Sequence, residues 1–160
     1  MLLNILTYPN KFLRTKGKSM VNILSAVNQE FIHDLKETML KKDGAGLAAR
    51  QVGRNENVFV VDTGTKILTA INAQIIFRSL NKIEFEEGCL SVPKVYGMVK
   101  RSKSILMKYY DELGQLHLQK FSGLGAIIIQ HEYDHNRGIL FIDKVIKFTT
   151  GYELIKDVKE

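Results

Sequence analysis

The stretch Ile-Ile-Ile-Gln-His-Glu-Tyr-Asp-His at residues 127–135 decides how the rest of the sequence is interpreted. Apolar and histidine side chains in and just before it recur at spacings of three and four, which places them on one helical face. These side chains are Leu124, Ile127, Ile128, His131 and His135. The histidines therefore continue an apolar stripe, and both imidazoles are expected to point into the protein.

Imidazoles four residues apart on a helix can bind the same divalent metal ion, and Glu132 beside them is a candidate proton shuttle. The pattern is His-Glu-x-x-His. The alternative is a core helix with two hydrogen-bonded histidines, because so short a pattern also occurs by chance. Metal binding therefore requires a third ligand elsewhere in the chain.

The composition suits one globular domain over residues 1–160, because the chain has 160 residues of which 45% are hydrophobic. No apolar run approaches the length of a membrane span, and residues 1–9 lack the zones of a signal peptide. We therefore expect a soluble, cytoplasmic protein without a membrane partner.

The formal charge of +6 is spread along the chain instead of forming a basic block. A well-solvated surface explains it, and weak contact with the ribosome would also fit. Zinc-finger spacing, an RNA-binding aromatic motif and a basic helix are all missing from the sequence. Sequence-specific binding of nucleic acid is therefore not expected.

Periodicity predicts the other regular elements. Residues 25–42 should form an amphipathic helix capped by Ser25, with a stripe that repeats every four residues: Val27, Phe31, Leu35 and Met39. Residues 58–61 read as a buried strand, and residues 66–78 as two short strands broken near Asn72. Residues 104–110 and 116–121 should form a hairpin.

The remaining boundaries come from capping residues. Ser122 is expected to cap the helix that carries the two histidines, and Gly138 to end it. Residues 149–160 are expected to form a short closing helix. His33 and His117 lie off the apolar stripes and are assigned no role.

The segment Gly-Ala-Gly-Leu-Ala-Ala-Arg-Gln-Val-Gly at residues 44–53 lets the backbone pass close to a neighbour. A phosphate cradle is one explanation, but the glycine spacing matches neither the dinucleotide fingerprint nor the P-loop. A strand lying against a peptide-like ligand fits better. The amide of Gln51 is able to donate to a developing oxyanion, although most glutamines are only surface residues.

Cys89 is the single cysteine and cannot form an internal disulfide. A free cysteine is usually a small buried apolar residue. Here it follows Gly88 at a break in the pattern, where a side chain can turn toward a site. A thiolate with two helix histidines would leave a fourth metal position open for water, as catalysis needs.

Three motifs together resemble those of the peptide deformylase family. They are Gly-Ala-Gly-Leu-Ala-Ala-x-Gln at 44–51, Glu-Gly-Cys-Leu-Ser at 87–91 and Gln-His-Glu-x-Asp-His at 130–135, in the family's order. The likeness extends from the Tyr-Pro-Asn lead-in at 8–10 to Asp143 and so covers nearly the whole chain. It implies an α+β fold, with antiparallel sheets packed around a central metal-binding helix.

The resemblance also assigns roles to residues at matching positions. The metal ligands would be Cys89, His131 and His135. Glu132 would be the general acid and base, while Gln51 and the backbone N–H of Leu90 would bind the oxyanion. The reaction implied is removal of the formyl group from the formylmethionine of newly made polypeptides, with release of formate.

For the substrate, the resemblance implies that Gly46, Gly88 and their flanks hold the peptide backbone as an added strand. The methionine side chain would enter an apolar pocket near Ile127 and Ile128. Ala45 stands where a branched residue is common and would widen that pocket.

The cofactor implied is one divalent metal ion, with Fe²⁺ the family's usual ion; Zn²⁺, Ni²⁺ and Co²⁺ also suit the ligand set. The chain departs from the usual pattern at Arg50, commonly proline or a small residue, and at Lys94, often glycine. Its tail is short beside members with a long basic C-terminal helix, which leaves contact with the ribosome open.

Two other function classes compete with this interpretation. A zincin-type peptidase shares the His-Glu-x-x-His helix, but takes a third ligand downstream that is missing here. A non-catalytic basic binding protein would explain the charge, but would leave Glu132 and Gln51 as coincidences. Metal analysis separates these possibilities.

Overall fold

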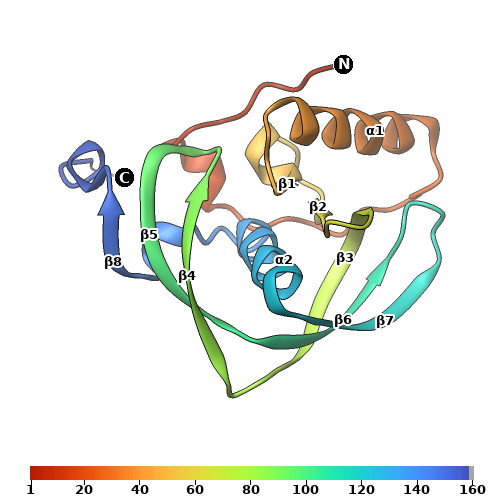
Figure 1. The fold of residues 1–160 in the computed structure, drawn as a ribbon. Helices are drawn as coiled ribbons and strands as arrows, with labels where there is room; N and C mark the ends of the chain where they lie inside the picture. The colour runs from red at the N-terminus through yellow and green to blue at the C-terminus, as the bar shows by residue number, and fades with distance from the viewer. Residues whose placement is uncertain (159–160) are drawn as a thin grey trace.

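The computed structural model describes residues 1–158, in which two sheets surround one of two α-helices (Figure 1). The helices are α1 (Ala26–Lys41) and α2 (Gly123–His135). The larger sheet has the order β1 (Gly46–Ala48), β2 (Val58–Asp62), β3 (Ile67–Arg78), β6 (Ser104–Tyr110) and β7 (Leu116–Ser122). The smaller sheet has the order β4 (Lys82–Cys89), β5 (Val92–Ser102) and β8 (Val145–Thr150).

All neighbouring strands in both sheets are antiparallel, so the predicted α+β class is confirmed. Short 3₁₀ turns lie at Lys11–Arg14, Ala49–Val52, Phe141–Asp143 and Tyr152–Leu154. Within residues 1–158, no helix is both long and apolar enough to cross a membrane.

Helix α2 occupies the centre of the molecule, with the two sheets on different sides of it (Figure 1). Ala126 and Ile129 pack into the core cluster formed by the larger sheet. The single apolar stripe predicted for this helix is too narrow, because Gln130, Glu132 and Asp134 are buried as well. The prediction that Leu124 belongs to this stripe is wrong, because its side chain lies in the first turn of the helix and is 55% exposed.

Helix α1 confirms the first predicted helix, and the side chain of Ser25 caps it by accepting a hydrogen bond from the backbone N–H of Asn28. Phe31, Leu35 and Met39 are buried as expected. Val27 is 66% exposed, which contradicts its place in the predicted stripe. The 16-residue helix is about 24 Å long. In its first turn the part-buried contacts come from Gln29, whose side-chain amide donates to Ile23 O and Glu112 O.

The strand predicted at 58–61 and the hairpin of β6 and β7 are confirmed. The two strands predicted at 66–78 are in fact the single strand β3, whose register with β6 shifts after Ile71. Asn72 lies in this irregularity with a φ of 53°. Its side chain accepts a hydrogen bond from Met20 N and donates one to Met20 O, which stabilises a bulge instead of a break.

Strands β4 and β5 were missed by the sequence interpretation, although they carry Cys89 into the site. Residues 82–87, Lys-Ile-Glu-Phe-Glu-Glu, expose most of their side chains and lack a strong apolar alternation. The paired strand β5 supplies the missing apolar side, with Val95 and Val99 buried. Strands β1 and β4 are both edge strands of their sheets.

The helix boundaries agree with prediction only in part. Ser122 is the N-cap residue of α2, but its side chain forms no capping hydrogen bond there. The helix ends at His135, before Gly138, which has a φ of +75° in the following turn. The predicted closing helix is wrong at its start, because Thr149 and Thr150 belong to β8, and only a 3₁₀ turn follows. Its last two positions, 159–160, lie outside the described residues.

Gly138→Ala should destabilise the protein far more than Gly64→Ala. Both glycines have positive φ, of +75° and +81°, so each substitution costs roughly 1 kcal/mol in backbone strain. A Cβ at position 138 would lie 2.2 Å from the carbonyl oxygen of Arg14, whereas position 64 is open. We expect urea unfolding to show an extra loss of at least about 2 kcal/mol for Gly138→Ala. Equal losses would contradict this packing of the turn.

Candidate active site

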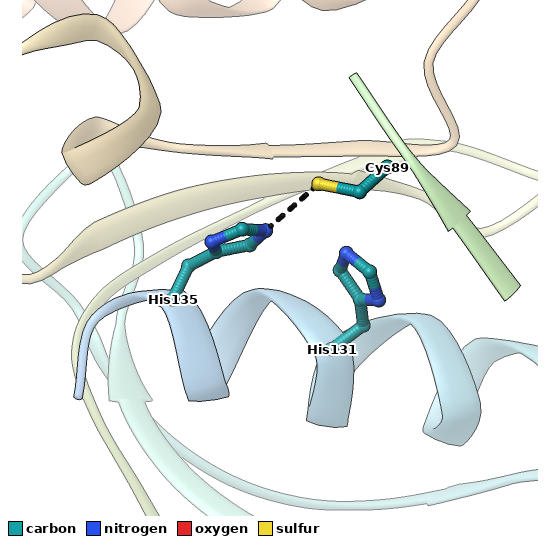
Figure 2. Close-up of side chains that lie close together, drawn as sticks. All are labelled: Cys89, His131 and His135. Carbon is teal, nitrogen blue, oxygen red and sulfur yellow. Dashed lines mark hydrogen bonds between the residues drawn. The ribbon is translucent and has the colours of Figure 1, made fainter. Parts of the chain in front are cut away.

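A thiol and two imidazoles converge beside α2 (Figure 2). Cys89 ends β4, and His131 and His135 lie one turn apart on the helix. The Cys89 Sγ and His135 Nε2 atoms are 3.2 Å apart, and one ligand atom from each of the three residues lies within 4.8 Å of the others. The three predicted ligands are therefore brought together in a group that could hold a metal ion.

The backbone around Cys89 is shaped by close packing. Gly88 faces Tyr96 across the β4–β5 pair, and a Cβ at Gly88 would lie 2.5 Å from the tyrosine ring. The register shifts between Gly88 and Cys89, just before the turn that leads into β5. This irregularity ends the strand beside the helix, where the thiol faces His135.

A buried carboxylate orients His131. Glu87 Oε2 lies 2.8 Å from His131 Nδ1, and Arg101 makes hydrogen bonds of 2.8 and 2.9 Å to the two oxygens of Glu87. Burial raises the pKa of Glu87, but hydrogen bonds from Arg101 and His131 outweigh it and bring the pKa to about 2. The carboxylate is therefore an acceptor for Nδ1–H, which directs Nε2 toward the thiol.

Arg101 and Asp134 extend this contact. Arg101 Nη1 donates a 2.5 Å hydrogen bond to Asp134 Oδ2. The sequence interpretation missed Glu87, Arg101 and Asp134 as supporting residues. Glu87 and Asp134 lie within the recognised motifs and next to predicted ligands, which was a usable signal, whereas nothing local to Arg101 marks it.

The electrostatics of the three-residue group suit a cation. Burial holds the pKa of His135 well below its usual value, which keeps the imidazole neutral as a ligand must be. Burial also lowers the pKa of His131, but interactions with Cys89 and Glu87 outweigh it and raise that pKa well above its usual value. The surroundings thus favour positive charge beside the thiol, and the donor set of one sulfur and two nitrogens fits a transition metal.

Glu132 lies next to this group, and its side chain is buried. Among the described residues, Glu132 Oε2 has no hydrogen-bond partner. Burial raises the pKa of this carboxyl to about 7. A carboxyl with this pKa can both accept and release a proton near neutral pH. Gly46 leaves room for it, because a Cβ there would lie 2.5 Å from Glu132 Oε1.

The amide of Gln51 is held in one orientation. Its Oε1 accepts a 2.8 Å hydrogen bond from the backbone N–H of Ala48. Its Nε2 must therefore face the other way, where it lies 3.2 Å from Ser91 Oγ and 3.5 Å from Cys89 Sγ. The predicted amide donor is thus aimed at the thiol and is 1% exposed, not a surface glutamine.

A cavity of about 450 Å³ opens between the edge strands β1 and β4 and reaches α2. All five residues predicted to bind substrate line it: Ala45, Gly46, Gly88, Ile127 and Ile128. Gln51, Leu90 and Glu132 line it as well. Phe85 and Tyr96 also line the cavity but were not predicted, since the strands that carry them were missed.

Lys94 lies at the cavity in an unusual backbone conformation. Lys94 has a φ of 64°, a left-handed conformation that glycine adopts without strain. Lys94 also lines the cavity and brings a positive charge to it.

Comparisons with known proteins agree with this arrangement. The family model described as "Polypeptide deformylase" matches residues 2–150. A peptide deformylase of Pseudothermotoga lettingae is 41% identical over 151 residues, covering 92% of this chain and 87% of that protein. The crystal structure of peptide deformylase from Thermotoga maritima is 34% identical with a TM-score of 0.88, covering 91% of this chain and 98% of that one.

A third similar protein is a class I type b peptide deformylase from Acinetobacter baumannii, solved with Met-Ala-Ser bound. It is 28% identical with a TM-score of 0.86, covering 91% of this chain and 99% of that one. These relatives cover most of the chain, and the family model over residues 2–150 includes every motif that lines the cavity. The chain belongs to the polypeptide deformylase family.

Proposed function

We propose that the residues around the cavity carry out deformylation, the hydrolytic removal of the formyl group from N-terminal formylmethionine. The observation that carries this proposal is the convergence of the Cys89, His131 and His135 group with Glu132 and the Gln51 amide. A hydrolase acting on an amide needs an activated water, a proton carrier and donors for the oxyanion. This group of side chains offers each of them.

Cys89, His131 and His135 would hold one divalent metal ion, for which their ligand atoms and charge environment are suited. Such an ion lowers the pKa of water and polarises a carbonyl oxygen. We infer that Fe²⁺ is the native ion, while Zn²⁺, Ni²⁺ and Co²⁺ would also bind, because thiolate and imidazole accept all of them.

Glu132 would act as the general base and then as the general acid. Its pKa of about 7 supports both steps, taking a proton from the attacking water and passing it to the leaving amine. Gln51 Nε2 and the backbone N–H of Leu90 would donate to the oxyanion that forms on the former formyl oxygen. Formate and a free N-terminus are the products.

The substrate backbone would bind as an added strand between the edges of β1 and β4, where both sheets leave hydrogen-bonding groups available. Its methionine side chain would enter the apolar part of the cavity at Ile127 and Ile128. The similar protein of Acinetobacter baumannii was solved with Met-Ala-Ser bound, a peptide that begins with methionine, which supports a substrate of this kind for the present chain.

The substrates of this activity are nascent polypeptides, so we infer that the chain acts in the cytoplasm. We also propose that residues 1–160 form a single catalytic domain. The formal charge of +6 supports weak contact with the ribosome, which carries a strongly negative RNA surface. No role in membrane binding or in reading a nucleic-acid sequence is proposed.

Purified without oxygen, the protein should carry about one transition-metal ion per chain, predominantly iron. Cys89→Ala, His131→Ala and His135→Ala should each lose most of it, because each removes one of three protein ligands. Elemental analysis by mass spectrometry measures this directly. His117→Ala is the matched control and should keep the ion, since His117 contacts Asp111 on the β6–β7 hairpin and is not one of the three ligands. Full metal content in any ligand variant would refute the assignment.

Glu132→Gln should keep the metal ion and the fold but lower kcat at least ~10²-fold, because a general acid and base is removed. Glu84→Gln serves as the control: it changes an exposed glutamate on β4 that pairs with Lys100, and should leave kcat unchanged. Formate release under saturating substrate is the measurement. Near-normal turnover of Glu132→Gln would reassign this carboxyl to a structural role.

A further inference from the structure

Arg50 is an unusual residue for its position, since its side chain is fully buried at 0% exposure. Among residues 1–158 it forms no ion pair with a carboxylate. Its guanidinium instead donates to three neutral oxygens: Asn55 Oδ1 at 2.7 Å, Phe12 O at 3.1 Å and Arg54 O at 3.3 Å. It also lies over the Phe12 ring, 3.8 Å from the centroid. A buried charge is costly, so its retention calls for a specific benefit.

These contacts join the N-terminal lead-in to the turn that carries Gln51. Phe12 belongs to the 3₁₀ turn Lys11–Arg14, and Arg50 precedes Gln51 in the turn Ala49–Val52. The guanidinium is a rigid planar fork, and here it links the lead-in carbonyl with the loop that follows the Gln51 turn. Arg50 therefore fixes the lead-in against that turn and the loop that follows it.

The same lead-in holds the other parts of the oxyanion region. The backbone N–H of Leu6 donates to Gln51 O at 2.7 Å, and the backbone N–H of Tyr8 donates to Ser91 O at 2.7 Å. Gln51 Nε2 donates to Ser91 Oγ at 3.2 Å, so the two residues held by the lead-in also contact each other. The lead-in thus spans the Gln51 turn and the turn after Cys89, and Arg50 anchors it beyond these contacts.

We propose that Arg50 is a positioning residue for the oxyanion: by clamping Phe12 and the lead-in to the Ala49–Val52 turn, it holds the Gln51 amide aimed at Cys89. The inference rests on the proposed role of Gln51. A displaced oxyanion donor stabilises the transition state less, and misplacement by about 1 Å can cost as much as ~10²-fold in rate. The effect should appear in kcat more than in KM, because the donor acts on charge that develops during the reaction.

The test is a double-mutant cycle on the metal-loaded enzyme with Arg50→Met, Gln51→Ala and the combined variant. We expect Gln51→Ala to lower kcat about 10²-fold and Arg50→Met about 10-fold, with KM changed less than about 2-fold. In the Gln51→Ala background, adding Arg50→Met should change kcat less than about 2-fold, since no amide remains to be positioned. A merely structural role would instead lower kcat by the same factor in both backgrounds, which would overturn the proposal.

Two further variants serve as a control and as a replacement in this cycle. Arg54→Met removes a guanidinium that lies over Phe31 and bonds to Glu56 without touching the lead-in, and it should leave kcat unchanged. Arg50→Lys replaces Arg50→Met in the cycle if the latter does not fold, because it keeps the charge but loses the planar fork. If Gln51→Ala leaves kcat unchanged, the oxyanion role of Gln51 and the Arg50 proposal both fail. If Gln51→Ala lowers kcat but Arg50→Met lowers it by the same factor in both backgrounds, only the Arg50 proposal fails.

Discussion

The buried ion pairs of Arg101 are the interaction on which the geometry of the site depends. Arg101 lies on β5 and contacts Glu87 on β4 and Asp134 on α2, so one guanidinium joins both strands to the central helix. Arg101, Glu87 and Asp134 are at most 5% exposed. Burying such charges is expensive, but breaking one partner away typically costs about 3–5 kcal/mol. The network therefore favours one rotation of the helix relative to the smaller sheet, and that rotation sets where Cys89 meets the two histidines.

The central helix α2 buries apolar and polar side chains alike, and the two sheets pack on it accordingly. One face of α2 contributes Ala126 and Ile129 to the core of the larger sheet, while Cys89 packs beside a separate cluster built on β5 and Phe141. The site lies where these clusters meet, which buries the imidazoles and Glu132 and leaves the Cys89 thiol half-buried at the cavity. Low exposure gives Glu132 its raised pKa and keeps His135 neutral. The two edge strands leave the entrance to the cavity lined by backbone, as binding of an extended peptide requires.

The sequence predicts this site better than the fold around it. Ligands on a helix follow from spacing, and the motif around Cys89 is local, so the metal group could be anticipated without knowing the topology. Strands β4 and β5 could not, because β4 exposes most of its side chains, β5 alternates irregularly, and the pairing that joins them has no local mark in the sequence. The bulge at Asn72 likewise depends on a distant partner, the backbone of Met20. Arg101 is the clearest case, since its importance comes from two carboxylates on other elements.

The most direct test of the account compares formyl-Met-Ala with acetyl-Met-Ala as substrates of the metal-loaded protein. The two share the methionine side chain and the backbone, so binding away from the reacting carbon is nearly equal. A carbonyl held near Gln51, the Leu90 N–H and the metal group leaves little space for the acetyl methyl, and the formyl carbon is the more electrophilic. We expect rapid release of formate and almost no acetate. Free alanine as the main product, or no product from a metal-loaded sample, would contradict it.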